Sequence, residues 1–129
     1  MKVYEYLLNA AREEPDKACL EFMGKAIPYA YLADEARCVA AGIRGLGIEP
    51  GDSVGLMLPN LPQFVSALYG ALMNGNVVVP LNVLLKPPEI RYQVEDSNMR
   101  LIFVFGMFLP QVEEAMAEMA DPPKVIVIG

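Results

Sequence analysis

The nine residues 74–82, Asn-Gly-Asn-Val-Val-Val-Pro-Leu-Asn, constrain the fold more than any other segment. Gly75 is suited to the left-handed conformation that ends a helix. The three valines at 77–79 form an uninterrupted β-branched run, which is typical of a parallel strand covered on both faces. Pro80 has no N–H to give to a ladder and ends the strand. The segment therefore predicts a helix end, a central buried strand and a strand exit in succession.

Short apolar runs alternate with amphipathic stretches on both sides of this segment. Four apolar strands separated by three helices imply right-handed crossovers and a mainly parallel sheet. The expected fold class is α/β, with a three-layer, mainly parallel sheet and crossover helices. The strands are predicted at 53–58, 77–80, 101–104 and 125–128, and the helices at 62–74, 88–97 and 109–119.

The segment before this alternation reads differently. A helix is predicted at 3–12, where Val3, Tyr6, Leu7 and Ala10 form one stripe. Strands at 18–22 and 25–28 flank a turn and predict a small β-hairpin. A long amphipathic helix follows at 29–45, with glycines at 45 and 47 as left-handed exits. We therefore expect residues 1–28 to form a helix and a hairpin, and residues 29–129 to form the βαβ region.

Length and composition fit one compact domain with an unusual surface. The chain has 129 residues, of which 54% are hydrophobic, so disorder is excluded. That apolar content is high for a small unit and predicts a surface that something else covers. The last predicted strand also has an open edge. Both features lead us to expect an incomplete fragment of a larger domain, and, for the chain alone, a homo-oligomer.

Charge and targeting signals limit the partners that the protein can have. The net charge is -6, and the ten basic residues are scattered, whereas nucleic-acid binding needs a concentrated positive footprint. Neither an apolar run of ~18 residues nor an export segment is found. The sequence predicts a cytoplasmic protein that binds no nucleic acid and is associated with membranes at most peripherally.

Several chemistries are excluded because their residues are missing. The sequence contains no histidine, no threonine and only three serines. A Ser–His or Cys–His catalytic pair and a histidine-dependent metal site are therefore impossible within the chain. Cys19 and Cys38 lack metal or redox spacing, and we interpret them as two buried free thiols rather than a disulfide.

Three glycine- or proline-containing segments are candidate phosphate loops. Residues 42–47 place their glycines after a helix, whereas a phosphate cradle needs strand, glycine loop, then helix. Residues 51–55 lack the required lysine and run into a strand, so a turn is predicted. Residues 58–62 have the right order, and helix N-termini attract anions, but they contain no glycine. We expect Asn60 to cap the following helix, with ligand contact as the alternative.

Acidic and aromatic residues form the remaining candidate sites. Neighbouring carboxylates on a helix do not face each other, so a solvated surface is favoured over a Mg²⁺ or acid–base site. The aromatic cluster spans a strand end and a helix start, which favours core packing over a greasy pocket. The residues concerned are Glu13, Glu14, Asp34, Glu35, Glu113, Glu114 and Glu118 for the acids, and Phe103, Phe105, Met107 and Phe108 for the aromatic cluster.

An ordered set of short motifs spans nearly the whole chain. The motifs are PDKA at 15–18, YAYL at 29–32, GIEPGDSV at 47–54, PN at 59–60, LMNGNVVVPLN at 72–82, PPEI at 87–90 and EDS at 95–97. In this order they resemble the N-terminal portion of the AMP-forming acyl-CoA synthetases, long-chain fatty-acid–CoA ligases in particular. Pro28 departs from the family, which usually has a capping Ser or Thr there, and Asn74 and Asn76 stand where small apolar residues are usual.

The resemblance implies a function for a longer parent protein. Members of the family convert a carboxylic acid and Mg·ATP to an acyl-adenylate and then transfer the acyl group to coenzyme A. It implies that the family's phosphate loop, ribose-binding acid, Mg²⁺ carboxylate and catalytic lysine map onto no residue here. We therefore assign no catalytic, cofactor-binding or metal residue and expect the chain alone to be inactive. A free-standing flavodoxin-like binding module and a self-associating structural domain remain as alternatives.

Overall fold

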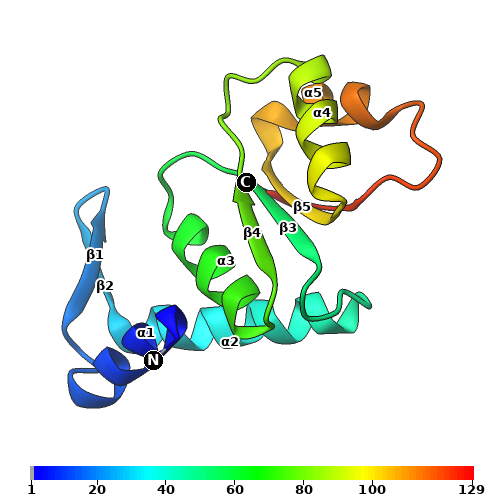
Figure 1. Ribbon diagram of the computed structural model, residues 1–129. Helices are drawn as coiled ribbons and strands as arrows, with labels where there is room; N and C mark the ends of the chain where they lie inside the picture. The colour runs from blue at the N-terminus through cyan, green and yellow to red at the C-terminus, as the bar shows by residue number, and fades with distance from the viewer. Residues whose placement is uncertain (1) are drawn as a thin grey trace.

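The computed structural model describes residues 2–129, and Met1 lies outside the described residues. Every predicted helix and strand is found, and most bounds agree within one or two residues (Figure 1). In chain order the elements are α1 Val3–Glu13, β1 Ala18–Phe22, β2 Lys25–Pro28, α2 Tyr29–Gly45, β3 Ser53–Met57, α3 Pro62–Met73, β4 Val77–Pro80, α4 Pro87–Ser97, β5 Met99–Phe105, the 3-10 helix η1 Gly106–Phe108, α5 Leu109–Met116 and β6 Lys124–Ile128.

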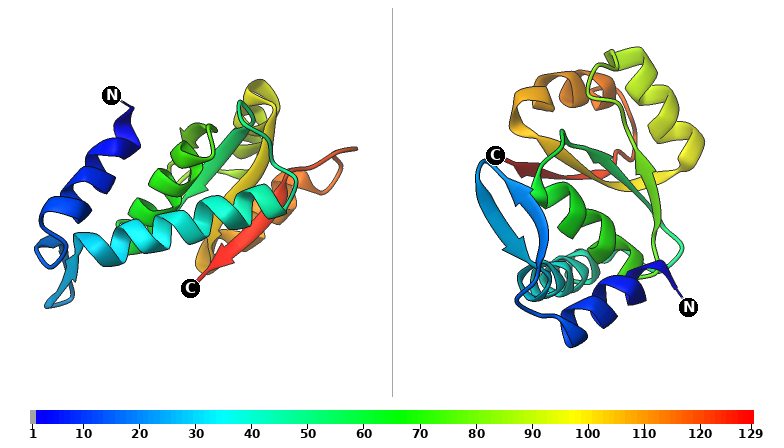
Figure 2. Two further views of the ribbon diagram at one scale, coloured as in Figure 1. Left: turned by 90° about the horizontal axis from the view of Figure 1, so that it is seen from below. Right: turned by 90° about the vertical axis from the view of Figure 1, so that its left-hand side faces the viewer.

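The main sheet is parallel and lies between two layers of helices. Its strand order is β4-β3-β5-β6, and all three neighbouring pairs are parallel. Helices α2 and α3 pack on one face and α4 and α5 on the other (Figure 2). The predicted three-layer α/β architecture is confirmed.

Alternating side chains of β3 and β5 build the two core layers. Val54 and Leu56 of β3 and Phe103 of β5 face α2 and α3. Met57 of β3 and Ile102 of β5 face α4 and α5. This alternation follows from the two-residue period of a strand. Both central strands are therefore covered on both faces, as the apolar runs predict.

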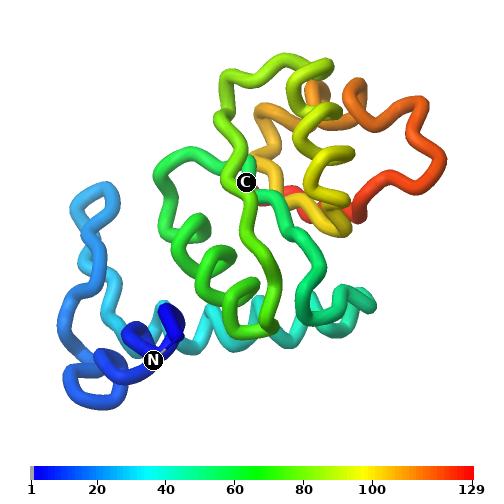
Figure 3. Tube along the Cα trace, in the orientation of Figure 1, coloured from blue at the N-terminus to red at the C-terminus, as the bar shows by residue number. Residues whose placement is uncertain are grey.

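The N-terminal helix and the hairpin form a separate unit beside α2 and α3 (Figure 3). The hairpin turn is Met23-Gly24, with φ of 51° and 81°, the pair of positive values that a two-residue type I′ turn requires. The predicted stripe of α1 is wrong in part. Leu7 of the predicted stripe is buried and Ala10 is half-buried, but Val3 and Tyr6 are exposed, because α1 has α2 and α3 to pack against on only one narrow side.

The prediction that residues 77–79 form a central strand is wrong. Strand β4 lies at the edge of the sheet, and Val77 is 53% exposed. Val78 and Val79 still pack against the two opposite core layers. A β-branched run indicates that its side chains are packed against other residues, but it does not indicate how many strands its backbone pairs with.

Candidate functional site

The carboxyl end of the parallel sheet is the place where this topology positions a site. The chain leaves β3 for α3 on one face, whereas it leaves β5 for η1 and α5 on the other, and β3 and β5 are neighbours. In open α/β sheets, ligands bind in the crevice beside such a switch point. The loops after β3, β4 and β5 therefore form the candidate site, as the arrangement of the helix layers makes visible (Figure 2).

The loop between β3 and α3 carries one polar side chain, Asn60, which is exposed. The expectation that Asn60 caps α3 is wrong. The N-cap is Leu61, without a side-chain hydrogen bond, and Pro62 opens the helix. The Phe64 N–H donates back to the Leu61 carbonyl at 3.0 Å, so the chain tightens its own first turn. The prolines around Asn60 set the loop so that the helix begins one residue too late for a cap.

An apolar pocket of about 200 Å³ lies between this loop and the hairpin. Leu20 and Phe22 of β1 line one side, and Leu61 and Phe64 line the other. Glu21 is the only charged side chain in the lining. Such a pocket can hold a small apolar group, but it presents no set of converging polar groups that would orient a reaction.

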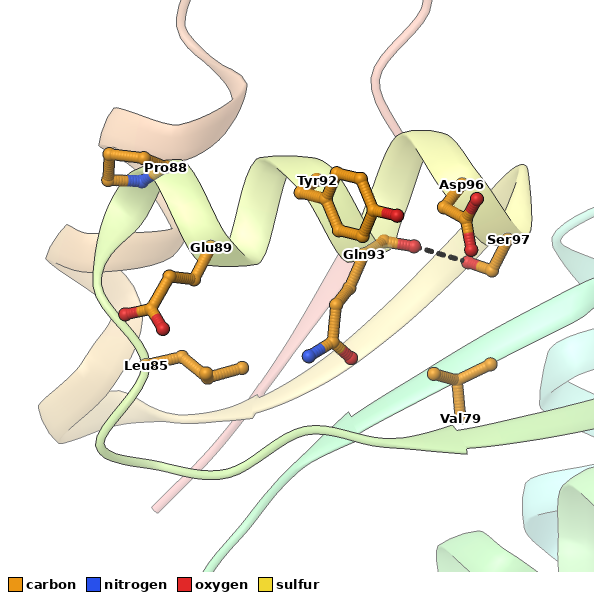
Figure 4. A pocket seen from close by; sticks show the side chains of 8 residues that line it. All are labelled: Val79, Leu85, Pro88, Glu89, Tyr92, Gln93, Asp96 and Ser97. Atoms are coloured by element: carbon orange, nitrogen blue, oxygen red, sulfur yellow. Dashed lines mark hydrogen bonds between the residues drawn. The ribbon is translucent and has the colours of Figure 1, made fainter.

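A larger groove, of about 590 Å³, runs between β4 and α4 (Figure 4). Val79 and Leu85 form its apolar floor. Polar groups in its lining already make hydrogen bonds within or next to α4. Ser97 Oγ donates to the Gln93 carbonyl at 2.7 Å. Glu89 likewise accepts the Lys86 N–H at 3.0 Å. Despite its size, this groove is a weaker candidate than the carboxyl end of the sheet, because it lies beside an edge strand and away from the switch point.

The acidic side chains confirm the interpretation of a solvated surface. Glu14 pairs with Lys17 at 3.1 Å and Asp34 with Arg37 at 2.9 Å, both at the surface. Glu35 accepts a hydrogen bond from the Tyr31 hydroxyl at 2.9 Å, and this bond raises the pKa of Tyr31. Among residues 2–129, no group of three or more Cys, Asp or Glu side chains could hold a metal ion. The remaining acids of the candidate clusters, Glu13, Glu113, Glu114 and Glu118, are exposed.

The glycine segments are turns, as predicted. Residues 42–47 end α2, where Gly47 has a φ of 82° and its N–H bonds the Arg44 carbonyl at 3.0 Å. Gly45 stays inside the helix, so only one of the two expected left-handed exits is used. Gly51, with a φ of 91°, turns the chain into β3. Neither segment precedes a helix, and neither forms a cradle for phosphate.

The aromatic cluster divides between the two core layers. Phe103 and Phe105 pack on the side of α2 and α3, and Phe108 packs on the side of α4 and α5. The rings of Phe105 and Phe108 meet at 6.2 Å between centroids. Met107 is 71% exposed. Core packing is therefore confirmed for the three phenylalanines, and the methionine points outward at the carboxyl end of the sheet.

Both cysteines are free, as predicted, but they are not both buried. Cys38 is exposed on α2, and Cys19 is half-buried. Burial raises the pKa of the Cys19 thiol, which a hydrogen bond with Tyr29 partly opposes. Cys38 falls on the outer side of α2 because the helix turns the apolar residues beside it, Val39 and Ala36, toward the core.

The structure contains one buried polar cluster that was not predicted from the sequence. Asn74 and Asn76 are 2% and 5% exposed. They lie at the amino end of the sheet, where Asn74 Oδ1 accepts a hydrogen bond from Arg44 Nε at 3.1 Å. The sequence feature that could have predicted this cluster is the pair of asparagines on either side of Gly75, at positions where the resembled family usually has small apolar residues.

No helix within residues 2–129 has both the length and the apolar character needed to cross a bilayer. The β3–α3 loop does not fit a phosphate group, because it has no glycine that would let backbone amides close around one. The site can offer apolar surface and a loop framework.

Comparison with known proteins shows which proteins share this sequence and fold. The chain is 34% identical over 105 residues to a long-chain-fatty-acid–CoA ligase of Bacillus subtilis (strain 168), which covers 81% of this chain and 19% of that protein. It is 35% identical over 113 residues to a long-chain-fatty-acid–CoA ligase of Yersinia pestis, covering 87% of this chain and 20% of that protein. The chain thus spans about a fifth of the length of these relatives.

A solved structure extends the likeness to the fold. The anthranilate CoA ligase AuaEII, crystallised in complex with anthranoyl-AMP, superposes with a TM-score of 0.94 and 27% identity. The superposition covers 100% of this chain and 25% of that one. The family model described as "AMP-binding enzyme" matches residues 7–128. The chain therefore belongs to the AMP-binding enzyme family of adenylate-forming CoA ligases.

Proposed function

We propose that this chain is the N-terminal scaffold segment of an AMP-forming acyl-CoA ligase that activates a long-chain fatty acid. The parent reaction joins a carboxylic acid, ATP and coenzyme A to give acyl-CoA, AMP and pyrophosphate. The observation that carries the proposal is the superposition of the entire chain on one quarter of a CoA ligase. Residues 1–28 and 29–129 would then be the helix–hairpin and βαβ parts of one large domain in a cytoplasmic enzyme.

A scaffold role follows from what the side chains at the carboxyl end can do. Asn60 is the one polar side chain of the β3–α3 loop, and Met107 and the phenylalanines beside it are apolar. None of these groups can act as a nucleophile or as a general base, and the one cation of the loops after β3, β4 and β5, Lys86, is the N-cap residue of α4. ATP, Mg²⁺ and coenzyme A would be held by other parts of the parent, and this segment would set the position of the sheet.

A chimera tests the proposal. Residues 7–128 would replace the matching segment of the Bacillus subtilis ligase, and fatty-acid-dependent exchange of pyrophosphate into ATP would be measured. We expect the chimera to retain exchange and the chain alone to stay at background. A chimera carrying Leu56→Asp, a substitution in the fully buried centre of β3, is the control for a misfolded segment. An exchange rate that follows the purified chain alone would show that the chain holds catalytic groups of its own.

The strand order favours a second candidate, a free-standing flavodoxin-like binding module. The order β4-β3-β5-β6 corresponds to the 2-1-3-4 arrangement of doubly wound sheets. Nucleotide binding in such modules uses hydroxyl- or glycine-rich loops at the carboxyl end, and the β3–α3 loop here has neither. A calorimetric titration with ATP or a flavin nucleotide separates the two candidates, because only the module would bind.

A further inference from the structure

The step from Asn74 to Gly75 joins two residues that can react with each other in water. The backbone nitrogen that follows an asparagine can attack the side-chain carbonyl of that asparagine. A glycine nitrogen does so with the least hindrance, because glycine has no Cβ. No other asparagine of the chain is followed by a glycine. Asn74 is therefore the asparagine whose sequence context most favours deamidation.

The fold holds both reacting groups in hydrogen bonds. The Gly75 N–H donates to the Leu72 carbonyl at 3.0 Å, which directs it into the last turn of α3. The Asn74 side-chain nitrogen, which would have to leave as ammonia, donates to the Ile48 carbonyl at 3.2 Å and to Asn76 Oδ1 at 2.9 Å. Only 2% of Asn74 is exposed to water. In this closed arrangement the reaction is blocked.

The turn between α3 and β4 can open without unfolding the rest of the sheet. It lies at the amino end of the sheet beside α2 (Figure 1), and Gly75 itself is exposed. Its carbonyl accepts the Gly51 N–H at 2.8 Å. The strand that follows is an edge strand, in which Val77 is 53% exposed. Segments held by surface hydrogen bonds and few apolar contacts open at a lower free energy than the whole domain.

We propose that Asn74 is a deamidation site that the asparagine cluster, Asn74 and Asn76 with their partners, keeps closed and that local opening of the α3–β4 turn activates. In the open turn the Gly75 nitrogen bonds to Asn74 Cγ and gives up its proton. The Cγ–Nδ2 bond breaks, and Nδ2 takes up a proton through water and leaves as ammonia. Water then opens the resulting cyclic imide. Cleavage of the new bond from nitrogen to Cγ gives aspartate, and cleavage of the original peptide bond gives isoaspartate.

Neither product fits the closed turn. An aspartate carboxylate only accepts hydrogen bonds, and at position 74 it would face two acceptors, the Ile48 carbonyl and Asn76 Oδ1. Asn76 cannot turn its nitrogen toward the carboxylate without losing its own bonds to two loop carbonyls. Of the present partners, Arg44 alone can still donate. Isoaspartate adds a carbon to the main chain of the turn. Conversion therefore loosens the amino end of the sheet irreversibly.

Incubation at neutral pH, in buffer and in concentrated guanidinium chloride, tests the closed state. Conversion is followed by mass spectrometry of the peptide that contains Asn74, from the mass gained when OH replaces NH₂. We expect conversion at least roughly tenfold slower in the folded chain than in the denatured chain. Asn60, which is exposed and precedes a leucine, should stay unconverted in both. Equal rates for Asn74 in the two solvents, or no conversion in the denatured chain, would overturn the proposal.

Two matched variants separate local opening from global unfolding. Asn76→Ala removes one partner of Asn74 and two further bonds of the turn. Val112→Ala truncates a fully buried side chain in the layer of α4 and α5, away from the turn. Unfolding in guanidinium chloride measures the stability of both. In buffer, Asn76→Ala should speed the conversion at least roughly threefold, and Val112→Ala should leave it unchanged.

A milder variant keeps the test valid if Asn76→Ala does not fold. Arg44→Ala changes an exposed side chain and removes a single bond to Asn74, so it should speed the conversion by a smaller factor. Acceleration by Val112→Ala equal to that by Asn76→Ala would show that only global unfolding exposes the site, and would contradict the proposal. An unchanged rate in both Asn76→Ala and Arg44→Ala would contradict it as well. These outcomes do not depend on the proposed function, which the exchange assay tests separately.

Discussion

The two ends of the parallel sheet are held together in different ways. At the amino end, the turn between α3 and β4 is hydrogen-bonded to the loop between α2 and β3. Asn74 Nδ2 donates to the Ile48 carbonyl at 3.2 Å and to Asn76 Oδ1 at 2.9 Å. Asn76 Nδ2 in turn donates to the Glu49 carbonyl at 2.8 Å. These side chains are buried and fully partnered, so they fix the spacing of the two chain segments.

The loops at the carboxyl end bond within themselves. The Leu61 N–H donates to the Pro59 carbonyl at 2.8 Å, and the Asn82 side chain accepts the Leu84 N–H at the same distance. Apolar side chains project from this end, and Leu84 and Met107 are 81% and 71% exposed. The hydrogen bonds found among residues 2–129 therefore give the carboxyl end local order, and none of them joins two of its loops.

This difference indicates that the amino end of the sheet is the scaffold and that the carboxyl end is the candidate site. The hydrogen bonds at the amino end fix the positions of the strands. The strands therefore stay in place when the conformation of the loops at the carboxyl end changes. Loops carry function and tolerate change when a rigid framework positions them. We infer that the asparagine cluster is the structural device that frees the carboxyl-end loops to contact the rest of a larger enzyme.

The largest expected effect is from Asn74→Ala. The substitution removes three hydrogen bonds and leaves the buried Ile48 carbonyl without this donor, so we expect a loss of about 3 kcal/mol in the free energy of unfolding. Asn82→Ala is the matched control at the carboxyl end, where the side chain is exposed and makes one local bond. Urea unfolding of both variants measures the difference. Equal losses would mean that the two ends are held alike.

Gly75→Ala should have the next largest effect. Gly75 has a φ of 81°, and an added Cβ would lie 3.1 Å from Pro50 Cβ. Gly24 in the hairpin has the same φ, and nothing lies within 4 Å of its added Cβ. A left-handed backbone costs a residue other than glycine about 1–2 kcal/mol, so Gly24→Ala should lose about that much. Gly75→Ala should lose measurably more by urea unfolding, and an equal loss would show that the contact with Pro50 relaxes freely.

The sequence predicted the order and type of the elements because hydrophobic period and turn residues are local. Strand position was not predictable in the same way. The valines at 77–79 meet both core layers, yet their strand is at the edge, because neighbour choice depends on where α4 returns the chain. Asn74 and Asn76 show the second limit. Asparagine is ordinary at a helix end, and only the fold brings it against Glu49 and Asp52, whose carbonyls accept from Asn76.

The candidate site was predictable to a similar depth. The order strand, loop, helix located the segment 58–62, and the structure places it at the switch point. The predicted capping role of Asn60 was wrong. The helix begins one residue later than a cap by Asn60 would require, so that Leu61 occupies the N-cap position. Leu61 has the extended backbone of an N-cap, with φ of -118° and ψ of 156°, and its side chain cannot accept a hydrogen bond.

Asn60→Ala should therefore have the smallest effect of the series. A capping asparagine contributes about 1 kcal/mol to stability, and a surface side chain without such a role contributes less than about 0.5 kcal/mol. We expect the smaller value, because Asn60 is exposed and α3 takes no side-chain cap. Unfolding in urea should place the midpoint of Asn60→Ala within error of the unaltered chain. A loss near 1 kcal/mol would mean that Asn60 braces the carboxyl end after all, and that the contrast between a bonded amino end and a free carboxyl end is smaller than the structure indicates.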